Sequence, residues 1–193
     1  MSTETTDYIV VPFNPIPADK AGASAEDIER EKDFIRKRIL DKSNEELVND
    51  AEAMDLLNQL GSDLNINAFA CNFRDASGNV NTSVDLANNL NRRIFHRLSI
   101  TKPDEDVTRI PFYITSTTFA QEDYQECATN FKRRLGLIGD EDLFVLRNVV
   151  MSPFGSTDNF VKELADYFKQ VLEEEIQVCC VILEKVRTRN LCL

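Results

Sequence analysis

The segment Asp142–Met151 (DLFVLRNVVM) constrains the fold more than any other part of the chain. After its first residue it is apolar except at Arg147 and Asn148, and Ser152-Pro153 closes it. Such a run, rich in β-branched residues, is typical of a strand that helices bury on at least one side. Leu64–Arg74 (LNINAFACNFR) is also apolar at both alternating positions. Strands of this kind need helices against the sheet, so a layered domain is predicted.

Helical patterns alternate with these strands. The expected elements are a helix capped by Thr82 or Asp85 and running to Leu98, a strand Ile110–Ser116, a helix Gln121–Leu135 ended by Gly136, and a last long helix capped by Thr157 or Asp158. This order predicts an α+β fold of the two-layer α/β type. Its sheet is expected to be mixed or antiparallel, with about three to four strands covered by helices.

The amino-terminal part has a different character. Tyr8–Pro12 is a short β-branched run, and acidic helical patterns follow it. Ser24 precedes one helix, while Ser43 and Glu46 form a capping box before a second helix that Gly61 ends. We therefore divide the chain into an amino-terminal strand and acidic helical part (1–61), a small α/β domain (62–175) and a tail (176–193). Within the tail, Ile176–Leu183 fits either a helix extension or an edge strand.

The charge balance excludes two classes of partner. The 193 residues include 22 Lys+Arg and 33 Asp+Glu, a formal net charge of −11. Nucleic acids and anionic lipid surfaces bind basic patches, so neither is expected as a partner. The longest apolar run, Val178–Leu183, is far shorter than the roughly 20 residues of a membrane span, and no apolar signal core begins the chain. Five cysteines without CxxC spacing favour reduced thiols, and we expect a cytoplasmic protein.

Few residues suggest chemistry of their own. The single histidine, His96, is interpreted as a partly buried helix residue in preference to a general base, because no nucleophile lies next to it in sequence. Cys179-Cys180 are interpreted as packing residues, since no histidine or third cysteine lies near them. Neither GxGxxG nor GxxxxGK[ST] occurs, and runs such as Glu173-Glu174-Glu175 are typical of solvated faces. No metal site and no phosphate-binding loop are expected.

Arg147 is the exception. It stands inside an otherwise apolar strand, so its guanidinium must lose water and needs an anionic partner there. One interpretation is an internal salt bridge with one of the many carboxylates. The other is a bidentate clamp for a carboxylate or phosphate at a cleft. The residues alone leave these two interpretations equal.

From Leu64 onward the chain resembles the carboxyl-terminal small domain of the group II pyridoxal-phosphate-dependent amino-acid decarboxylases, which include aromatic-amino-acid and glutamate decarboxylases. The similarity rests on Phe144-Val145-Leu146-Arg147, on Val149-Val150-Met151-Ser152 and on the helix Asn159–Glu173. A looser block combines Ala68–Arg74, Gly78-Asn79-Val80-Asn81, and the helix containing Leu90, Asn91 and Arg93. Ile100–Asp140 resembles an insertion shared with fungal members in secondary metabolism, and Tyr8–Gly61 resembles the stretch before the small domain in those proteins.

The resemblance implies a decarboxylase that converts an amino acid to an amine and carbon dioxide. In this family a large domain holds pyridoxal phosphate through a lysine preceded by histidine, and none of the nine lysines here has that neighbour. We therefore expect no catalytic, cofactor-binding or metal-ligating residue in this chain and no activity alone. The resemblance gives Arg147 a substrate-binding role. The expected partner is a large domain or a full-length decarboxylase subunit in a homo- or hetero-oligomer. The alternatives are a non-catalytic module that pairs with such subunits and a truncated remnant.

Overall fold

The computed structural model describes residues 3–5, 7–40, 42–60, 66–100, 102, 104, 106, 108, 110–149 and 160–190, with side chains of the last helix up to residue 182. These residues form two compact units. One is helical and spans Asn14–Leu64, and the other combines Ser2–Phe13 with Asn65–Leu193. Tyr8–Pro12 is therefore part of the second unit, because it pairs with a central strand there.

The second unit contains an antiparallel sheet in the order β1-β2-β3-β5-β4. Its strands are β1 (Thr3–Glu4), β2 (Tyr8–Pro12), β3 (Ile66–Phe73), β4 (Thr115–Phe119) and β5 (Leu143–Val149). The predicted α+β fold is confirmed, and the two-residue β1 adds an edge strand to those expected. The strands predicted from Leu64–Arg74 and Asp142–Met151 become the central pair, β3 and β5.

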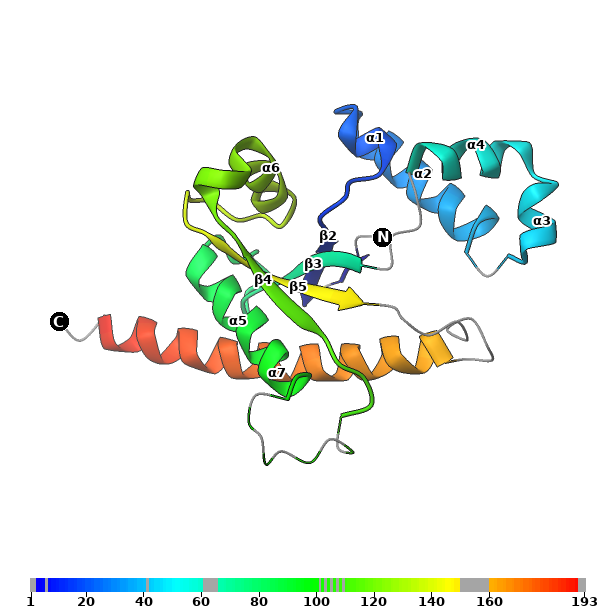
Figure 1. Ribbon diagram of the computed structural model, residues 1–193. Coiled ribbons are helices and arrows are strands. Elements are labelled where there is room, and N and C mark those ends of the chain that lie inside the picture. The colour runs from blue at the N-terminus through cyan, green and yellow to red at the C-terminus, as the bar shows by residue number, and fades with distance from the viewer. Residues whose placement is uncertain are drawn as a thin grey trace. The chain divides into compact units, whose positions relative to one another are not determined.

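Helices cover the two faces of the sheet unequally (Figure 1). On one face, α5 (Val84–Arg97) and α7 (Phe160–Asn190) pack against Phe69, Cys71 and Leu146. On the other face, α6 (Gln121–Arg134) and the loop after it cover Ala70 and Val145 through Phe131 and Leu135. Alternate residues of β5 thus enter two separate cores, which explains why this strand is apolar at both positions.

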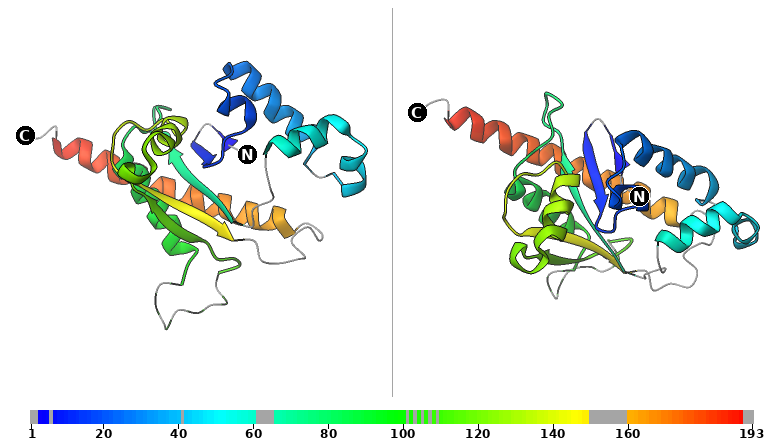
Figure 2. Two further views of the ribbon diagram at one scale, coloured as in Figure 1. Left: turned by 45° about the horizontal axis from the view of Figure 1, so that its top comes forward. Right: turned by 90° about the horizontal axis from the view of Figure 1, so that it is seen from above.

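Strands β3 and β5 pair over only half of their length. The paired residues run from Ile66 to Phe69 on β3 and from Leu146 to Val149 on β5. Beyond them the two strands splay apart, as Figure 2 shows in its left view. Two asparagines of α5 occupy this opening: Asn91 binds the N–H and C=O of Cys71, and Asn88 binds the N–H of Phe144. The helix therefore supplies the hydrogen bonds that a neighbouring strand would otherwise make.

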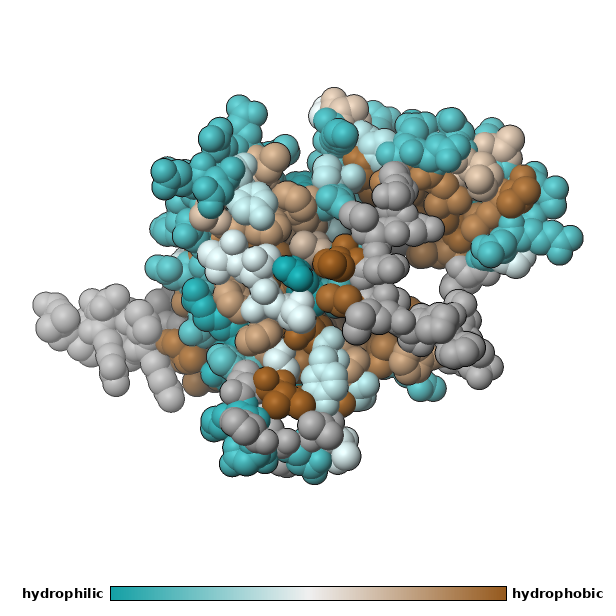
Figure 3. Space-filling view, viewed as in Figure 1, coloured by the Kyte–Doolittle hydropathy of each residue, from teal (hydrophilic) through white to brown (hydrophobic). Residues whose placement is uncertain are grey.

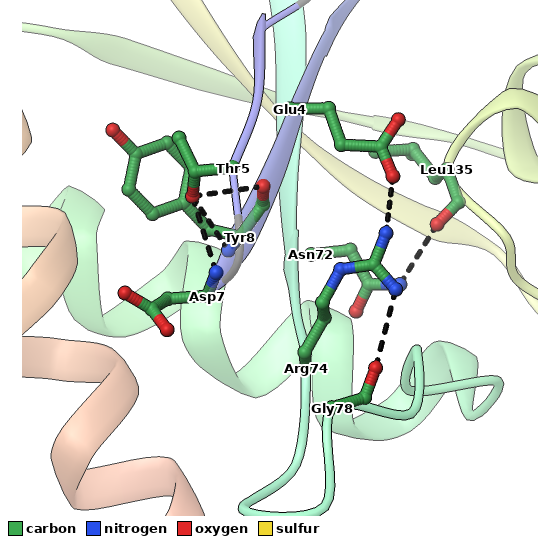
Figure 4. A network of polar contacts seen from close by, with 8 residues as sticks. All are labelled: Glu4, Thr5, Asp7, Tyr8, Asn72, Arg74, Gly78 and Leu135. Atoms are coloured by element: carbon green, nitrogen blue, oxygen red, sulfur yellow. Dashed lines mark hydrogen bonds and ion pairs between the residues drawn. The ribbon is translucent and has the colours of Figure 1, made fainter.

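A polar network holds the turn that follows β3 (Figure 4). The guanidinium of Arg74 binds the carboxylate of Glu4 and donates to the carbonyl of Gly78 at 3.3 Å. Inside the core, Asn72 donates to the carbonyl of Leu135 at 2.8 Å. Burial raises the pKa of the Tyr8 hydroxyl on the adjacent strand. These contacts hold the carboxyl end of β3 and the turn after it in place. Arg147 lies beside the other half of β3, next to Ala68.

The strand predicted over Ile110–Ser116 is wrong in position. Ile114 is buried but precedes the strand, which runs over Thr115–Phe119. Pro111 cannot donate to a ladder, so the apolar residues around it pack on the core as irregular chain. The observed strand is a polar TSTTF segment, and its threonines are β-branched and suited to an extended backbone.

One helix cap differs from the prediction, and one of the two alternatives predicted for the tail is observed. Ser83 caps α5 by accepting from the Leu86 N–H, in place of Thr82 or Asp85. The segment after Ile176 continues α7, so the helical alternative for the tail is confirmed through Asn190. The caps expected at Thr157 and Asp158 lie outside the described residues. No helix among the described residues is long and apolar enough to cross a membrane.

The helical unit contains α1 (Pro17–Lys20), α2 (Ala25–Arg38), α3 (Asn44–Val48) and α4 (Ala51–Leu60). Ser24 caps α2, and the capping box of Ser43 and Glu46 is present at α3, as predicted. The single helix expected after Ser43 is instead two helices. Asp50 explains the break, because its carboxylate accepts from the Ala53 N–H and pairs with Arg38 at 2.6 Å.

Helix α6 contains a strained residue that yields a stability prediction. Gln125 has φ 43° and ψ −119°, a conformation that only glycine adopts without strain. We expect Gln125→Gly to raise the free energy of unfolding by about 1 kcal/mol, whereas Gln125→Ala keeps the Cβ and gains nothing. Urea unfolding followed by circular dichroism measures both. Equal stability of the two variants would contradict the assignment of strain.

Candidate functional site

Arg147 lies near the carboxyl end of β5, beyond the part of the sheet that α6 covers. Leu143 and Val145 precede it on the same face, because alternate residues of a strand share a face. Its cross-strand neighbours are Ala68 on β3 and Thr115 on β4. Arg147 therefore lies between β3 and β4, outside the core that α6 covers.

The side chain of Arg147 is half-buried, and its Nε atom is fully buried without a hydrogen-bond partner. No ion pair among the described residues includes it. The internal salt bridge considered from the sequence is thus absent from the part of the chain that the structure describes. A buried guanidinium N–H without an acceptor is unfavourable, so an external anion would satisfy this group.

The surroundings of Arg147 are hydroxyl-bearing on one side and apolar on the other. Thr115 and Thr117 lie on the same face of the neighbouring strand β4, and the Thr115 hydroxyl donates to the Arg147 carbonyl at 3.4 Å. On the other side Val149 is paired with Ile66, which is 47% exposed. Figure 3 shows pale and apolar side chains over β4 and β5 on this side of the molecule.

This arrangement can bind an anion but carries no acid, base or nucleophile of its own. The cross-strand neighbours described here are alanine and threonine, and neither residue type titrates near neutral pH. A guanidinium beside hydroxyls suits a carboxylate, which it can bind in bidentate fashion. The sequence pointed to Arg147 and placed Thr115 in a predicted strand, but it gave no signal that the two residues are cross-strand neighbours.

The histidine and the cysteines considered from the sequence lie away from Arg147 in helix α5 and in the core. His96 is exposed on α5, so the partly buried position expected for it is wrong. Cys179 lies in the core shared with α5, and burial raises the pKa of its thiol to about 11. Burial also raises the pKa of the Cys71 thiol. Neither thiol is a reactive thiolate near neutral pH. The described residues contain no cluster of three metal-ligating side chains.

The described residues do not fit pyridoxal phosphate. The buried lysine among them, Lys132, donates from Nζ to the carbonyl of Glu141 at 3.0 Å and lies in the core of the α6 face. A cavity of the helical unit is lined by four carboxylates and no lysine. Neither of these two places thus offers a Schiff-base lysine beside a phosphate site.

This mismatch predicts the outcome of cofactor capture. When the chain is incubated with pyridoxal phosphate and reduced with borohydride, we expect scattered labelling of exposed lysines, well below one adduct per chain. The buried and hydrogen-bonded Lys132 should stay unlabelled. Intact mass and peptide mapping measure this. A stoichiometric adduct at one lysine would show that the chain contains a cofactor site of its own.

Comparison with known proteins shows the family of this chain. The family described as "Tyrosine decarboxylase, C-terminal" matches residues 39–176, which include Arg147 and the whole of Ile100–Asp140. An L-tyrosine decarboxylase of Enterococcus faecium is 32% identical over 105 residues. That match covers 50% of this chain and 17% of the bacterial protein, so the chain corresponds to a small part of that relative. The chain belongs to the family of tyrosine decarboxylase carboxyl-terminal domains.

Proposed function

We propose that this chain is the carboxyl-terminal part of a pyridoxal-phosphate-dependent amino-acid decarboxylase, which converts an amino acid to an amine and carbon dioxide. The observation that carries the proposal is the half-buried Arg147, with its unpartnered Nε, between β3 and β4. In this proposal Arg147 binds the carboxylate end of the substrate. The cofactor belongs to a large domain outside this chain, because the described residues do not fit it.

An aromatic amino acid is the substrate class that the neighbours of Arg147 support best. Ile66 and Val149 are apolar cross-strand neighbours two residues from Arg147 and its partner Ala68, so an amino acid could place its carboxylate on the guanidinium and its aromatic side chain against them. The bacterial relative is an L-tyrosine decarboxylase, which supports tyrosine or a similar amino acid. Fungal origin, secondary metabolism and a cytoplasmic location stay predictions of the sequence.

A chimeric enzyme tests the role of Arg147. The matching segment of the Enterococcus L-tyrosine decarboxylase is replaced by this chain, and decarboxylation of L-tyrosine is measured. If the chimera is active, Arg147→Met should lower kcat/KM by about 10- to 150-fold, since hydrogen bonds to charged groups contribute about 1.5–3 kcal/mol. Arg147→Lys should recover only part of this loss, because lysine cannot bind a carboxylate in bidentate fashion.

The matched control is Arg133→Met, which removes an exposed arginine from α6. It should leave kcat/KM unchanged. Circular dichroism and bound cofactor absorbance confirm that each variant is folded and loaded. An active chimera in which Arg147→Met equals the wild type would refute the substrate-binding assignment.

The alternative is a non-catalytic module that pairs with full-length decarboxylase subunits. The misfit of the described residues to pyridoxal phosphate favours it, together with the exposed Ile66 at the open end of the sheet. Such a module would bind a complete subunit without changing the number of active sites. An increase in activity per subunit on mixing would argue for a catalytic contribution, and binding without any increase would argue for the module.

A further inference from the structure

The two edges of the sheet differ in how they are protected from pairing with another strand. At one edge the two-residue strand β1 lies outside β2, and its Glu4 pairs with Arg74. At the other edge β4 is the last strand, and it pairs with β5 over its whole length without a bulge. Charged residues, proline and bulges are the usual protection of a sheet edge. The TSTTF sequence of β4 contains no charged residue and no proline, so this edge lacks that protection.

A contact of β5 shows which backbone groups of β4 point away from the sheet. The N–H of Phe144 donates to a side chain of α5 on the side of β3. Successive residues of an antiparallel strand point their N–H and C=O groups to opposite sides, so the next residue, Val145, points its groups toward β4. Val145 lies opposite Thr117, which therefore points its own groups inward. The groups of Ser116 and Thr118, on either side of it, point outward.

The residue before β4 gives the same direction independently. The N–H of Ile114 donates to the carbonyl of Leu98 at 3.0 Å, and its carbonyl accepts from Ser99 Oγ at 2.7 Å. Both partners belong to the chain that follows α5, so the groups of Ile114 point away from β5, as those of Ser116 and Thr118 do. Among the described residues, no backbone hydrogen bond from another segment reaches Ser116 or Thr118. This edge therefore presents two N–H donors and two C=O acceptors.

A second copy of β4 presents the same four groups in the order that satisfies them. When two copies run antiparallel about a two-fold axis at Thr117, Ser116 of each copy lies opposite Thr118 of the other, and each such pair exchanges two hydrogen bonds. All four outward groups of each copy are then paired. The ends match as well, because Ile114, which already has its partners, lies opposite Ala120, the residue before α6.

The composition of this edge suits contact between two acidic chains. Each copy has a formal net charge of −11 and repels the other over most of its surface. Strand β4 is uncharged, and Figure 3 shows pale, weakly polar side chains over it. Tyr113 before the strand is 47% exposed, and Tyr124, whose ring stacks on that of Phe119, is 38% exposed. Antiparallel pairing brings the start of one strand beside the end of the other, so these rings add apolar surface to the contact.

We propose that β4 pairs with β4 of a second copy of this chain, so that the two sheets join into one antiparallel sheet across a two-fold axis at Thr117. Thr117 then lies opposite Thr117 of the other copy. The two residues form a pair without hydrogen bonds between them, and the Cβ atoms of such pairs are about 4.5–5.5 Å apart. Both side chains lie on the sheet face of Val145. Position 117 is the position of β4 that faces itself, so substitutions there report on this register.

Charges at position 117 test the dimer. Size-exclusion chromatography with light scattering should show two chains for the wild type. Thr117→Lys and Thr117→Glu each place two like charges against each other at the axis, so each should weaken dimerisation by at least about tenfold. Mixing the two variants should restore dimers, because opposite charges then meet. Thr82→Lys and Thr82→Glu make the same changes at an exposed residue before α5, and neither should have an effect.

A proline at position 118 tests the hydrogen bonds. Thr118→Pro removes an N–H that points outward and none that pairs with β5, so the sheet of each copy should stay intact. The dimer loses two of its four backbone hydrogen bonds, and dimerisation should again weaken by at least about tenfold. Circular dichroism checks that the variant is folded.

A cysteine at the axis identifies the register. In a chain in which Cys127 and Cys192 are replaced by serine, Thr117→Cys should form a disulfide between copies when it is oxidised with copper phenanthroline. The Cα atoms of such a pair lie about 4.5 Å apart, within the range of disulfides. Ser116→Cys should not cross-link, since residue 118 lies opposite it. A wild-type chain that is monomeric at every concentration, a dimer that neither the position 117 charges nor Thr118→Pro weakens, or equal cross-linking at positions 116 and 117 would overturn the proposal. None of these readouts depends on decarboxylase activity.

Discussion

Asn91→Ala is expected to lower the free energy of unfolding of the sheet unit by about 3 kcal/mol. The side chain of Asn91 is fully buried, accepts from the Cys71 N–H at 2.9 Å and donates to the Cys71 C=O at 2.8 Å. Alanine leaves both backbone groups unpaired where β3 and β5 splay apart. Each unsatisfied buried group costs about 1–3 kcal/mol, and the better helix propensity of alanine recovers less than about 1 kcal/mol.

Asn89→Ala is the matched control. Asn89 lies two residues earlier on the same helix and is exposed, so its replacement should change the free energy of unfolding by less than about 0.5 kcal/mol. Urea unfolding followed by circular dichroism measures both variants. Hydrogen exchange should also show faster exchange of the Cys71 amide in the Asn91 variant. Equal unfolding midpoints would mean that water satisfies the Cys71 groups.

The contribution of Asn91 shows where sequence reasoning stops. The apolar pattern of Leu64–Arg74 and Asp142–Met151 predicted both central strands, because burial on two faces leaves a local signature. The sequence gives no local signal that these two strands pair over only about half of their length. The asparagines that fill the opening resemble ordinary polar residues of a helix surface, and only their contacts at a sequence separation of 20 reveal their role.

The candidate site was likewise predicted only in part. Arg147 was evident because a charge interrupts an apolar strand, and desolvation of a guanidinium requires an explanation. Its neighbours were not evident. Thr115 belongs to the polar strand Thr115–Phe119, whereas the predicted strand, Ile110–Ser116, was centred on the apolar residues before it and only overlapped the observed strand at Thr115 and Ser116. Strand pairing is a long-range property, and hydrophobic periodicity reports only on local burial.

The second large effect concerns the contact between α5 and α7. Glu175 of α7 is 5% exposed and receives hydrogen bonds from Arg93 Nε at 2.6 Å and from Arg97 Nη1 at 2.9 Å. Removing both arginines leaves a buried carboxylate without compensation. We therefore expect Arg93→Met with Arg97→Met to lower the free energy of unfolding by about 3–5 kcal/mol.

The carboxylate is buried much more deeply than the two arginines, so removing the acid and removing the arginines should have different effects. The arginine side chains are 37% and 43% exposed, so water can solvate them when the acid is removed. Glu175→Met alone should therefore lower the free energy of unfolding by much less than the double arginine change. The triple variant should return close to wild-type stability, because a well-packed apolar cluster replaces a buried ion pair at little or no loss.

A thermodynamic cycle over these variants separates charge from packing. Arg92→Met on the same helix is the control. It removes a guanidinium 5.1 Å from the Phe144 ring centroid, and should lower the free energy of unfolding by less than about 1 kcal/mol. Urea unfolding of the wild type and of these four variants at one pH gives the coupling energy between Glu175 and the two arginines. A triple variant as unstable as the double arginine variant would show that the arginine stems hold α5 and α7 together by packing. A return of the free energy of unfolding to near the wild-type value in the triple variant would show that Arg93 and Arg97 stabilise the protein mainly by neutralising Glu175.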